Sequence, residues 1–307
     1  MMDKRFLPFV AVLLTGICAF FSSCHSCQRQ GETDEERFDT FRYEHAIYEA
    51  SETLNTSSVQ QRIYVDYPQK SDSTVLADSL RAWIADKVAT HYAPVFGDSD
   101  AVITYTGDLR DADTLIQTVG KIGVTYMKDE LKEADGEGFE TQYNNDFSVE
   151  YLCQTARYIT FETKYEIFTG GAHGLWIYSG HTFRKSDGAE MGWRLLDMTK
   201  KQQIIDLFRE GIREYLSEGA DGEQLTDSAL YANLMLWDDP DTPENELEYG
   251  LPLPGTPPWL TDEGLAFIYQ QYEITAYALG LPCATIPIDK IAPLLSEEGR
   301  ELLGIKK

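Results

Sequence analysis

The sequence FETKYEIFTGGAHGLWIYSGHTF, at residues 161–183, contains the pattern that decides the fold class. Apolar or aromatic and charged side chains alternate in its first part, residues 161–168, and a period of two is typical of a β-strand with one solvent-facing side. A second run of alternating character follows at residues 175–183, and the glycine-rich pentapeptide Gly170–Gly174 joins the two runs. We therefore predict two neighbouring strands with a short loop between them.

The loop contains one histidine, His173, for which two interpretations stay open. An imidazole between glycines is accessible and titrates near neutral pH, so His173 could act as a general base or a metal ligand. Alternatively, Gly170 and Gly171 supply backbone conformations that other residues rarely adopt, and His173 hydrogen-bonds the loop. His173, His181 and a carboxylate such as Glu166 could hold a metal, but their spacing matches no recognised ligand set. We predict no metal and no cofactor.

Aromatic residues near the loop and in the C-terminal part form a candidate binding platform. They are Trp176, Tyr178, Trp193, Tyr269 and Tyr272. All of them except Trp193, together with Gly170, Gly171 and His173, make up the predicted binding site. Aromatic rings of this kind bind sugars or a protein partner, although they more often form sheet core.

No motif of a serine nucleophile accompanies His173. The sequence has no G-x-S-x-G pattern, and Ser179-Gly180 lacks the preceding glycine. Carboxylates are so numerous in this chain that pairs of them cannot identify a glycosidase. We therefore assign no catalytic residue, with His173 as a low-ranked candidate.

The order of predicted elements indicates the fold class. Two strands and then two helices fill the first half, and the second half opens with further strands before its helices. Strands grouped apart from helices are typical of α+β proteins. We predict an antiparallel sheet with helices packed on one side, in two consecutive α+β subdomains, residues 37–145 and residues 146–307. Asp187-Gly188, between two strand-like runs, predicts a hairpin whose returning strand follows at residues 189–196.

The N-terminus predicts a lipoprotein. A basic pair, Lys4-Arg5, precedes a short apolar run and then two serines before Cys24. This order is typical of a signal peptide of the lipoprotein kind, residues 1–23, and the apolar run is too short for a comfortable membrane span. Residues 24–36 are polar and predict a flexible tether. We expect a cell-envelope protein (outer membrane, on its periplasmic or surface side) attached by lipid at Cys24.

The remaining cysteines give no zinc pattern. Cys18 and Cys27 are weaker alternatives to Cys24 for lipidation. Cys153 and Cys283 are candidates for a disulfide in an oxidising compartment, with burial as separate thiols the equal alternative.

The net charge of the chain indicates which kinds of partner it can attract. The formal net charge is -25, from 26 Lys and Arg against 51 Asp and Glu. A field of that sign repels nucleic acids and anionic lipids and attracts cationic partners. We predict no nucleic-acid partner and no membrane contact beyond the lipid. The acidic, proline-rich stretch 238–258 is long enough for a binding loop, although acidic surface also serves solubility.

Several motifs act together as a family signature: Thr169-Gly-Gly-Ala-His-Gly174, Leu195-Leu-Asp-Met198 before a helix, and the run Leu260–Gly280 followed by Ile286-Pro-Ile288. In combination they resemble the extracytoplasmic domain of unknown function shared by the anti-sigma factor RsiV and the peptidoglycan deacetylase PdaC, over residues 146–303. Residues 37–145 resemble its usual smaller partner domain. The resemblance implies an α+β recognition module, and in the anti-sigma relative that module binds lysozyme. The deacetylase motif and a sigma-binding segment are absent from this sequence.

Three functions follow as hypotheses. The leading one is a non-enzymatic, lipid-anchored envelope protein that binds a basic protein such as a lysozyme-like hydrolase. The second is a module that binds peptidoglycan or another cell-wall glycan through exposed aromatic residues. The third is a hydrolase that uses His173.

Overall fold

The computed structural model describes residues 41–92, 103–134, 141–218, 224–235 and 251–306, all within the unit Phe38–Lys307. The predicted signal peptide, Cys24 and the tether lie outside the described residues. The described part combines two β-sheets with helices, so the predicted α+β class is confirmed. No helix in this part of the chain is both long enough and apolar enough to cross a membrane.

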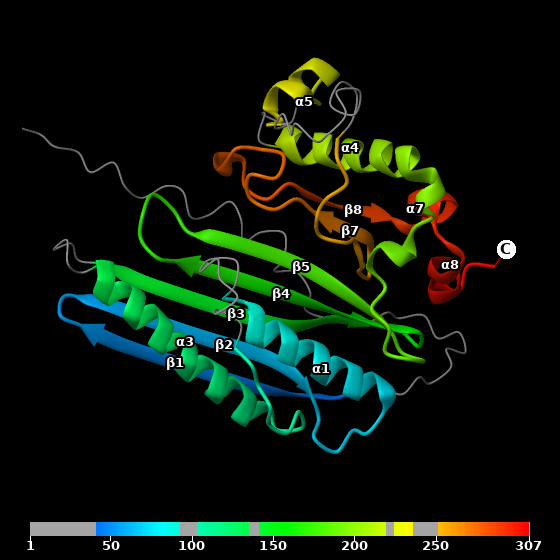
Figure 1. Ribbon diagram of the computed structural model, residues 1–307. Coiled ribbons are helices and arrows are strands. Elements are labelled where there is room, and N and C mark those ends of the chain that lie inside the picture. The colour runs from blue at the N-terminus through cyan, green and yellow to red at the C-terminus, as the bar shows by residue number, and fades with distance from the viewer. Residues whose placement is uncertain (1–40, 93–102, 135–140, 219–223, 236–250, 307) are drawn as a thin grey trace, which may run out of the picture. The chain divides into compact units, whose positions relative to one another are not determined.

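The larger sheet has five strands in the order β1-β2-β3-β4-β5 (Figure 1). Their bounds are Tyr43–Leu54 for β1, Ser57–Pro68 for β2, Gln142–Gln154 for β3, Tyr158–Phe168 for β4 and Leu175–Arg184 for β5. The alternating runs of residues 161–183 form β4 and β5, which pair antiparallel with Phe161 opposite His181. The two predicted strands are therefore neighbours, and β5 is an edge of the sheet.

One pairing corrects the prediction of an antiparallel sheet. β2 and β3 run parallel, with Ile63 opposite Phe147, so the sheet is mixed. Between these strands the chain forms α1 (Val75–Thr90) and α3 (Ala112–Ala134), and a parallel pair requires such a crossover. Both helices lie on one face of the sheet, as predicted (Figure 1).

The second half of the chain builds a smaller sheet with its own core. The three strands are β6 (Trp259–Leu260), β7 (Gly264–Ile268) and β8 (Cys283–Pro287), and the helices are α4 (Lys201–Glu218), α5 (Asp227–Asn233), α7 (Ile288–Ile291) and α8 (Glu297–Leu303). Alternate residues of β7 face opposite ways. Phe267 stacks on Phe208 of α4 with ring centroids 4.0 Å apart, whereas Ala266 and Ile268 pack with Trp259 and Tyr178 on the side of the large sheet. The small sheet therefore lies between α4 and β5.

The boundary that we expected between residues 145 and 146 falls inside β3. This strand pairs with β2 on one side and with β4 on the other, so the large sheet continues across that point. A β-bulge shifts the register between Tyr151 and Cys153. As a result, Tyr151 packs against the core under α1 and α3, and Cys153 belongs to the second core.

The turn at Asp187-Gly188 forms as predicted. The amide of Arg184 donates to the carbonyl of Ala189 at 2.9 Å, and Gly188 has a φ of 69°. The returning strand does not form. It is limited to one bridge between Phe183 and Glu190, because Gly192, with a φ of 46°, turns the chain into a 3-10 helix.

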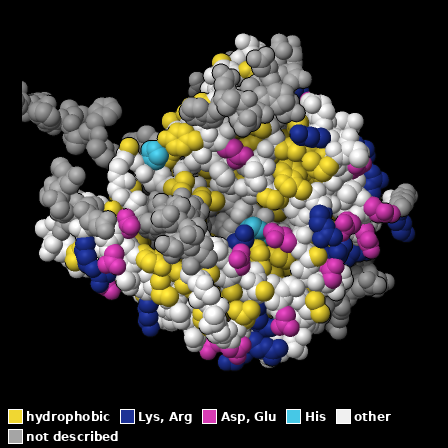
Figure 2. All heavy atoms as spheres, viewed as in Figure 1, with side chains coloured by type: hydrophobic (Ala, Val, Ile, Leu, Met, Phe, Trp, Pro, Cys, Tyr) yellow, Lys and Arg dark blue, Asp and Glu magenta, His cyan; other side chains and the backbone are white. Residues whose placement is uncertain are grey.

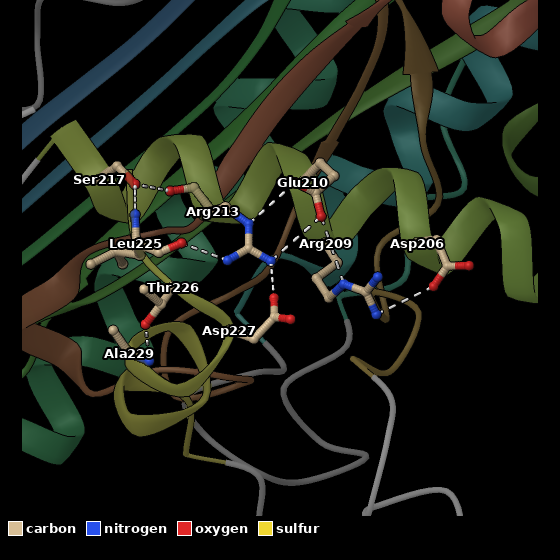
Figure 3. Close-up of polar contacts among 9 residues, drawn as sticks. All are labelled: Asp206, Arg209, Glu210, Arg213, Ser217, Leu225, Thr226, Asp227 and Ala229. Atoms are coloured by element: carbon tan, nitrogen blue, oxygen red, sulfur yellow. Dashed lines mark hydrogen bonds and ion pairs between the residues drawn. The ribbon is translucent and has the colours of Figure 1, made fainter. Parts of the chain in front are cut away.

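Arg213 of α4 makes hydrogen bonds and an ion pair to the first residue of α5 and to the segment before it (Figure 3). Its buried guanidinium donates to the carbonyl oxygen of Leu225 at 2.6 Å and to Asp227 Oδ1 at 2.5 Å. One helical turn further on, Ser217 Oγ accepts from the amide of Leu225 at 3.0 Å. Thr226 caps α5 by accepting from the amide of Ala229 at 3.2 Å. Arg213 and Ser217 of α4 thus both hold the segment from which α5 begins.

Candidate functional site

The histidine loop after β4 meets the segment after β7. His173 is exposed, and its Nε2 lies 2.8 Å from the hydroxyl of Tyr272, while its Nδ1 lies 3.0 Å from the carbonyl oxygen of Gly174. A carbonyl only accepts, so Nδ1 donates to it, and Nε2 of the neutral ring accepts from the Tyr272 hydroxyl. The loop glycines Gly170 and Gly171 have φ values of 91° and 89°, which require glycine or strain. The predicted backbone role of these glycines is therefore compatible with an exposed histidine.

Three rings gather at this point. The ring of His173 stacks on Tyr277 with centroids 3.8 Å apart and an interplanar angle of 20°. Tyr272 lies 5.8 Å from His173 and 6.0 Å from Tyr277, and it is 42% exposed. We call these three residues the aromatic cluster. Beside it lies a pocket of about 190 Å³, lined by Ile167, Thr169, His173, Gly174, Leu175, Gln271 and Tyr272.

The segment that carries Tyr272 is held by the edge of β5. The Oε1 atoms of Gln271 and Gln270 accept from the amides of Trp176 and Tyr178, at 3.1 and 3.2 Å. Nε2 of Gln270 donates to the carbonyl oxygen of Tyr178 at 2.7 Å. Tyr272 itself has a φ of 63°, which is uncommon for a residue with a side chain. Strained backbone of this kind persists where the surroundings hold it, and it is common at functional sites.

The other predicted platform residues are less accessible. Trp176 and Tyr178 are half-buried, and the hydroxyl of Tyr178 donates to Glu166 Oε1 at 2.6 Å. Tyr269 is fully buried, and its hydroxyl donates to the carbonyl oxygen of Pro252 at 2.6 Å. The prediction that Tyr269 belongs to an exposed platform is wrong, because its side chain, just after the end of β7, lies in the second core.

His181 does not approach His173. It lies near the far end of β5, where its Nδ1 is 2.6 Å from Glu190 Oε1 and its Nε2 is 2.8 Å from Ser179 Oγ. Burial lowers the pKa of His181, although Glu190 raises it in part. Burial raises the pKa of Glu190, but the hydrogen bond and charge of His181, together with the charge of Lys87, outweigh burial and leave that pKa below its usual value. Among the described residues no three His, Cys, Asp or Glu side chains are placed to hold a metal ion.

The cysteines of the candidate disulfide are not bonded to each other. Cys153 is buried, with its sulfur 3.7 Å from the carbonyl oxygen of Leu260, and Cys283 is half-buried on β8. Of the two alternatives, the structure has separate thiols. Most of the acidic stretch 238–258 lies outside the described residues.

Two features were missed by sequence reasoning. Tyr277 belongs to the aromatic cluster but was not among the predicted platform residues; it lies nine residues after the end of β7 at Ile268, at the start of a 3-10 helix. The contact of Ser179 with His181 was overlooked because the search was for a glycine-flanked serine. Its signal was present, since residues two apart on a strand share a face.

With the geometry described, comparison with known proteins gives one family signal. Residues 201–289 match the family model described as "Protein of unknown function (DUF3298)". This segment runs from α4 to the start of α7 and includes Tyr272 and Tyr277. A comparison with curated proteins found no match.

Two solved structures of DUF3298 proteins share the fold. One, a family member from Bacteroides fragilis, has a TM-score of 0.59 at 17% identity and covers 87% of this chain and 98% of its own. The other, from Pseudomonas aeruginosa, has a TM-score of 0.53 at 11% identity and covers 84% of this chain and 96% of its own. At such identities the likeness shows the fold alone. The narrower resemblance to the RsiV and PdaC domain stays a prediction.

Proposed function

We propose that this chain is a recognition protein of the cell envelope, attached by lipid at Cys24, which binds a basic protein through its aromatic cluster. The observation that carries the proposal is the exposed ring of His173, which lies flat on Tyr277 and accepts a hydrogen bond from Tyr272. Both ring nitrogens are engaged in holding that ring in place. An arrangement of this kind favours a contact surface over a proton-transfer site.

The size of the pocket favours a small group. Pockets for drug-sized ligands have volumes of about 300–1,000 Å³, and the pocket beside Tyr272 has about 190 Å³. It is suited to one side chain of a partner or to one sugar ring. A long substrate would extend beyond it over the exposed rings.

The charge favours a basic partner. Lys and Arg side chains bind over the faces of tyrosine rings, and a net charge of -25 attracts them over longer distances. On the face drawn in Figure 2, Asp and Glu side chains are scattered among Lys and Arg and form no single patch. Charge therefore accounts for attraction, and the aromatic cluster would supply the specific contact. A lysozyme-like hydrolase is the basic protein that the RsiV-like resemblance implies.

The affinity for lysozyme tests this proposal. We expect calorimetry to detect binding at about 50 mM salt that weakens at about 500 mM, because screening shortens the range of the charge. Tyr272→Ala and His173→Ala should each weaken binding by tenfold or more. Tyr126→Ala, which truncates a tyrosine that is 36% exposed on α3, is the matched control and should bind like the wild type. No binding at low salt, or equal binding by the Tyr272 variant, would overturn the proposal.

A cell-wall glycan is the second candidate, because exposed tyrosine rings also stack on sugars. Sedimentation with isolated peptidoglycan separates the two. Binding that survives high salt and depends on Tyr272 favours the glycan, since stacking on a neutral sugar is insensitive to ionic strength.

Attachment through Cys24 has its own test. We expect the mature chain to begin at Cys24 with a lipid mass added, as measured by intact mass spectrometry, and to fractionate with membranes. Cys24→Ser should leave the protein unprocessed, whereas Cys27→Ser should not change the mass of the lipid. An unmodified mature chain would contradict the lipoprotein prediction.

A further inference from the structure

A hydroxyl–imidazole–carboxylate network lies on β5, outside the aromatic cluster. The hydroxyl of Ser179 is 2.8 Å from Nε2 of His181, and Nδ1 of His181 is 2.6 Å from Glu190 Oε1. The hydroxyl of Thr163, on β4, is 2.7 Å from that of Ser179 and 3.4 Å from His181 Nε2. We call Ser179, His181 and Glu190 the serine network.

The fold brings these residues together by simple means. Ser179 and His181 are two residues apart on β5, so both side chains leave the same face of the sheet. The Asp187-Gly188 turn then returns the chain to bring Glu190 beside Phe183, where the two residues form a bridge. The side chain of Glu190 crosses from there to Nδ1 of His181.

The protonation states of His181 and Glu190 allow His181 to act as a general base. A carboxylate only accepts, so Nδ1 of His181 donates to Glu190, and Nε2 of the neutral ring accepts from Ser179. Burial lowers the pKa of His181 and Lys87 lowers it further, while Glu190 raises it in part. The imidazole is therefore neutral at pH 7 and has its open nitrogen toward a hydroxyl, which is the arrangement of base and nucleophile in serine hydrolases.

A backbone amide next to Ser179 points to the edge of the sheet. The amides of Trp176 and Tyr178 point away from β4, toward glutamine side chains. Alternate amides of a strand point the same way, so the amide of Gly180 points to this edge as well. The amide after the nucleophile is one donor of the oxyanion hole in many hydrolases, and Gly180 follows Ser179 directly.

We propose that the serine network is a second functional site, which cleaves short-chain carboxylic esters. Ser179 Oγ attacks the ester carbonyl while His181 Nε2 takes the hydroxyl proton. The C–O bond to the alcohol breaks, and the leaving alkoxide takes the proton from His181. Water then loses a proton to the same nitrogen and bonds to the acyl carbon, the bond from that carbon to Ser179 Oγ breaks, and Oγ takes the proton back from His181 as the acid leaves. The acyl group must be small, because Ser179 is half-buried and the indole of Trp83 lies 4.8 Å from the ring of His181.

A fluorophosphonate probe, which reacts with activated serines, tests the nucleophile. We expect covalent labelling of the full chain at Ser179, found by peptide mass spectrometry, together with hydrolysis of p-nitrophenyl acetate. Ser179→Ala should abolish both. Ser186→Ala, which removes an exposed hydroxyl in the neighbouring turn, is the matched control and should retain both. Circular dichroism of each variant confirms that the fold is intact.

Glu190→Gln tests the positioning role of the carboxylate. The amide keeps the shape but removes the charge that raises the pKa of His181. We expect the labelling rate to fall on the order of a hundredfold, and the midpoint of its pH profile to move to lower pH. A merely structural glutamate would not move that midpoint.

Three results would overturn the proposal: no labelling of the folded wild type, labelling that persists in Ser179→Ala, or a pH profile unchanged in Glu190→Gln. In the absence of labelling, the network only supplies hydrogen bonds to the buried imidazole of His181. The outcome is separable from that for the aromatic cluster, since lysozyme binding is measured with different variants.

Discussion

Gly180 of β5 faces the indole ring of Trp259 on β6 so closely that a Cβ at residue 180 would lie 2.2 Å from three atoms of that ring. Trp259 is 5% exposed and lies between the two sheets. Because Gly180 has no side chain, the indole ring of Trp259 fits directly against the backbone of β5. This contact sets how closely the small sheet approaches β5.

We expect Gly180→Ala to destabilise the protein by about 1–3 kcal/mol or more, because the added methyl group forces the indole or a strand to move. Denaturant unfolding measures the change. Gly171→Ala is the comparison. Its new Cβ meets nothing within 4 Å, so only the strain of a φ of 89° remains, at about 1–2 kcal/mol. A smaller loss for Gly180→Ala than for Gly171→Ala would contradict the packing argument.

Because His91 is buried, we expect the folded protein to lose stability in mild acid. Burial lowers its pKa from 6.5 to about 3, and Nδ1 donates to the carbonyl oxygen of Val88 at 2.7 Å. The unfolded chain therefore binds the proton more readily than the folded chain. The stability that depends on neutral His91 is complete above pH 6.5 and is lost as the pH falls toward 3.

His91→Phe should remove that dependence, because a phenyl ring keeps the stack on Phe147 and cannot be protonated. We expect the stability of the variant to fall less between pH 6.5 and pH 4, by about 3 kcal/mol. Urea unfolding at several pH values measures both curves. Parallel curves for variant and wild type would show that His91 titrates normally.

At Tyr272 the needs of stability and of binding differ: the backbone conformation favours glycine, whereas binding needs the tyrosine ring. Its φ of 63° costs about 1 kcal/mol for any residue with a Cβ, and glycine does not incur that cost. We expect Tyr272→Gly to be as stable as Tyr272→Ala or up to about 1 kcal/mol more stable, with the greater freedom of unfolded glycine offsetting part of the gain. Both variants should lose lysozyme binding. An alanine variant that is clearly the more stable would show that the turn carries no strain.

Replacement of Arg213 should destabilise α5 locally. Arg213→Met keeps the apolar stem but leaves the carbonyl of Leu225 without its buried donor (Figure 3). We expect a loss of about 2 kcal/mol and faster amide exchange in residues 225–233. Arg209→Met, one helical turn away, removes a pair with the exposed Asp206 and should cost about 0.5 kcal/mol. Equal effects on exchange would argue against a specific role for Arg213.

Local pattern predicted the elements better than their pairing. The two helices expected after the first two strands are present as α1 and α3, and the alternation of residues 161–183 forms β4 and β5. The parallel pairing of β2 with β3 could not be read in this way. It joins strands whose nearest ends, Pro68 and Gln142, lie 74 residues apart with α1 and α3 between them in the chain, and nothing in either strand alone specifies the direction of its neighbour.

The same limit applies to the site. Glycine spacing pointed to His173, but its partner Tyr272 lies 99 residues further along the chain. Tyr269 and Tyr272 looked alike in the sequence, yet one is fully buried and the other 42% exposed. The end of β7 at Ile268 and the turn after it decide that difference, and turn geometry depends on tertiary contacts such as those of Gln270 with β5.

The bulge of β3 has a consequence for the smallest piece of this chain that can fold. Because Cys153 of the second core lies in the chain between Tyr151 and Phe161, which both pack in the core under α1 and α3, no single cut through the polypeptide separates one core from the other. The DUF3298 segment expressed alone would leave its small sheet without the surface around Gly180 and without Cys153 and Tyr158. The family match at residues 201–289 therefore marks a part of one larger compact unit, Phe38–Lys307.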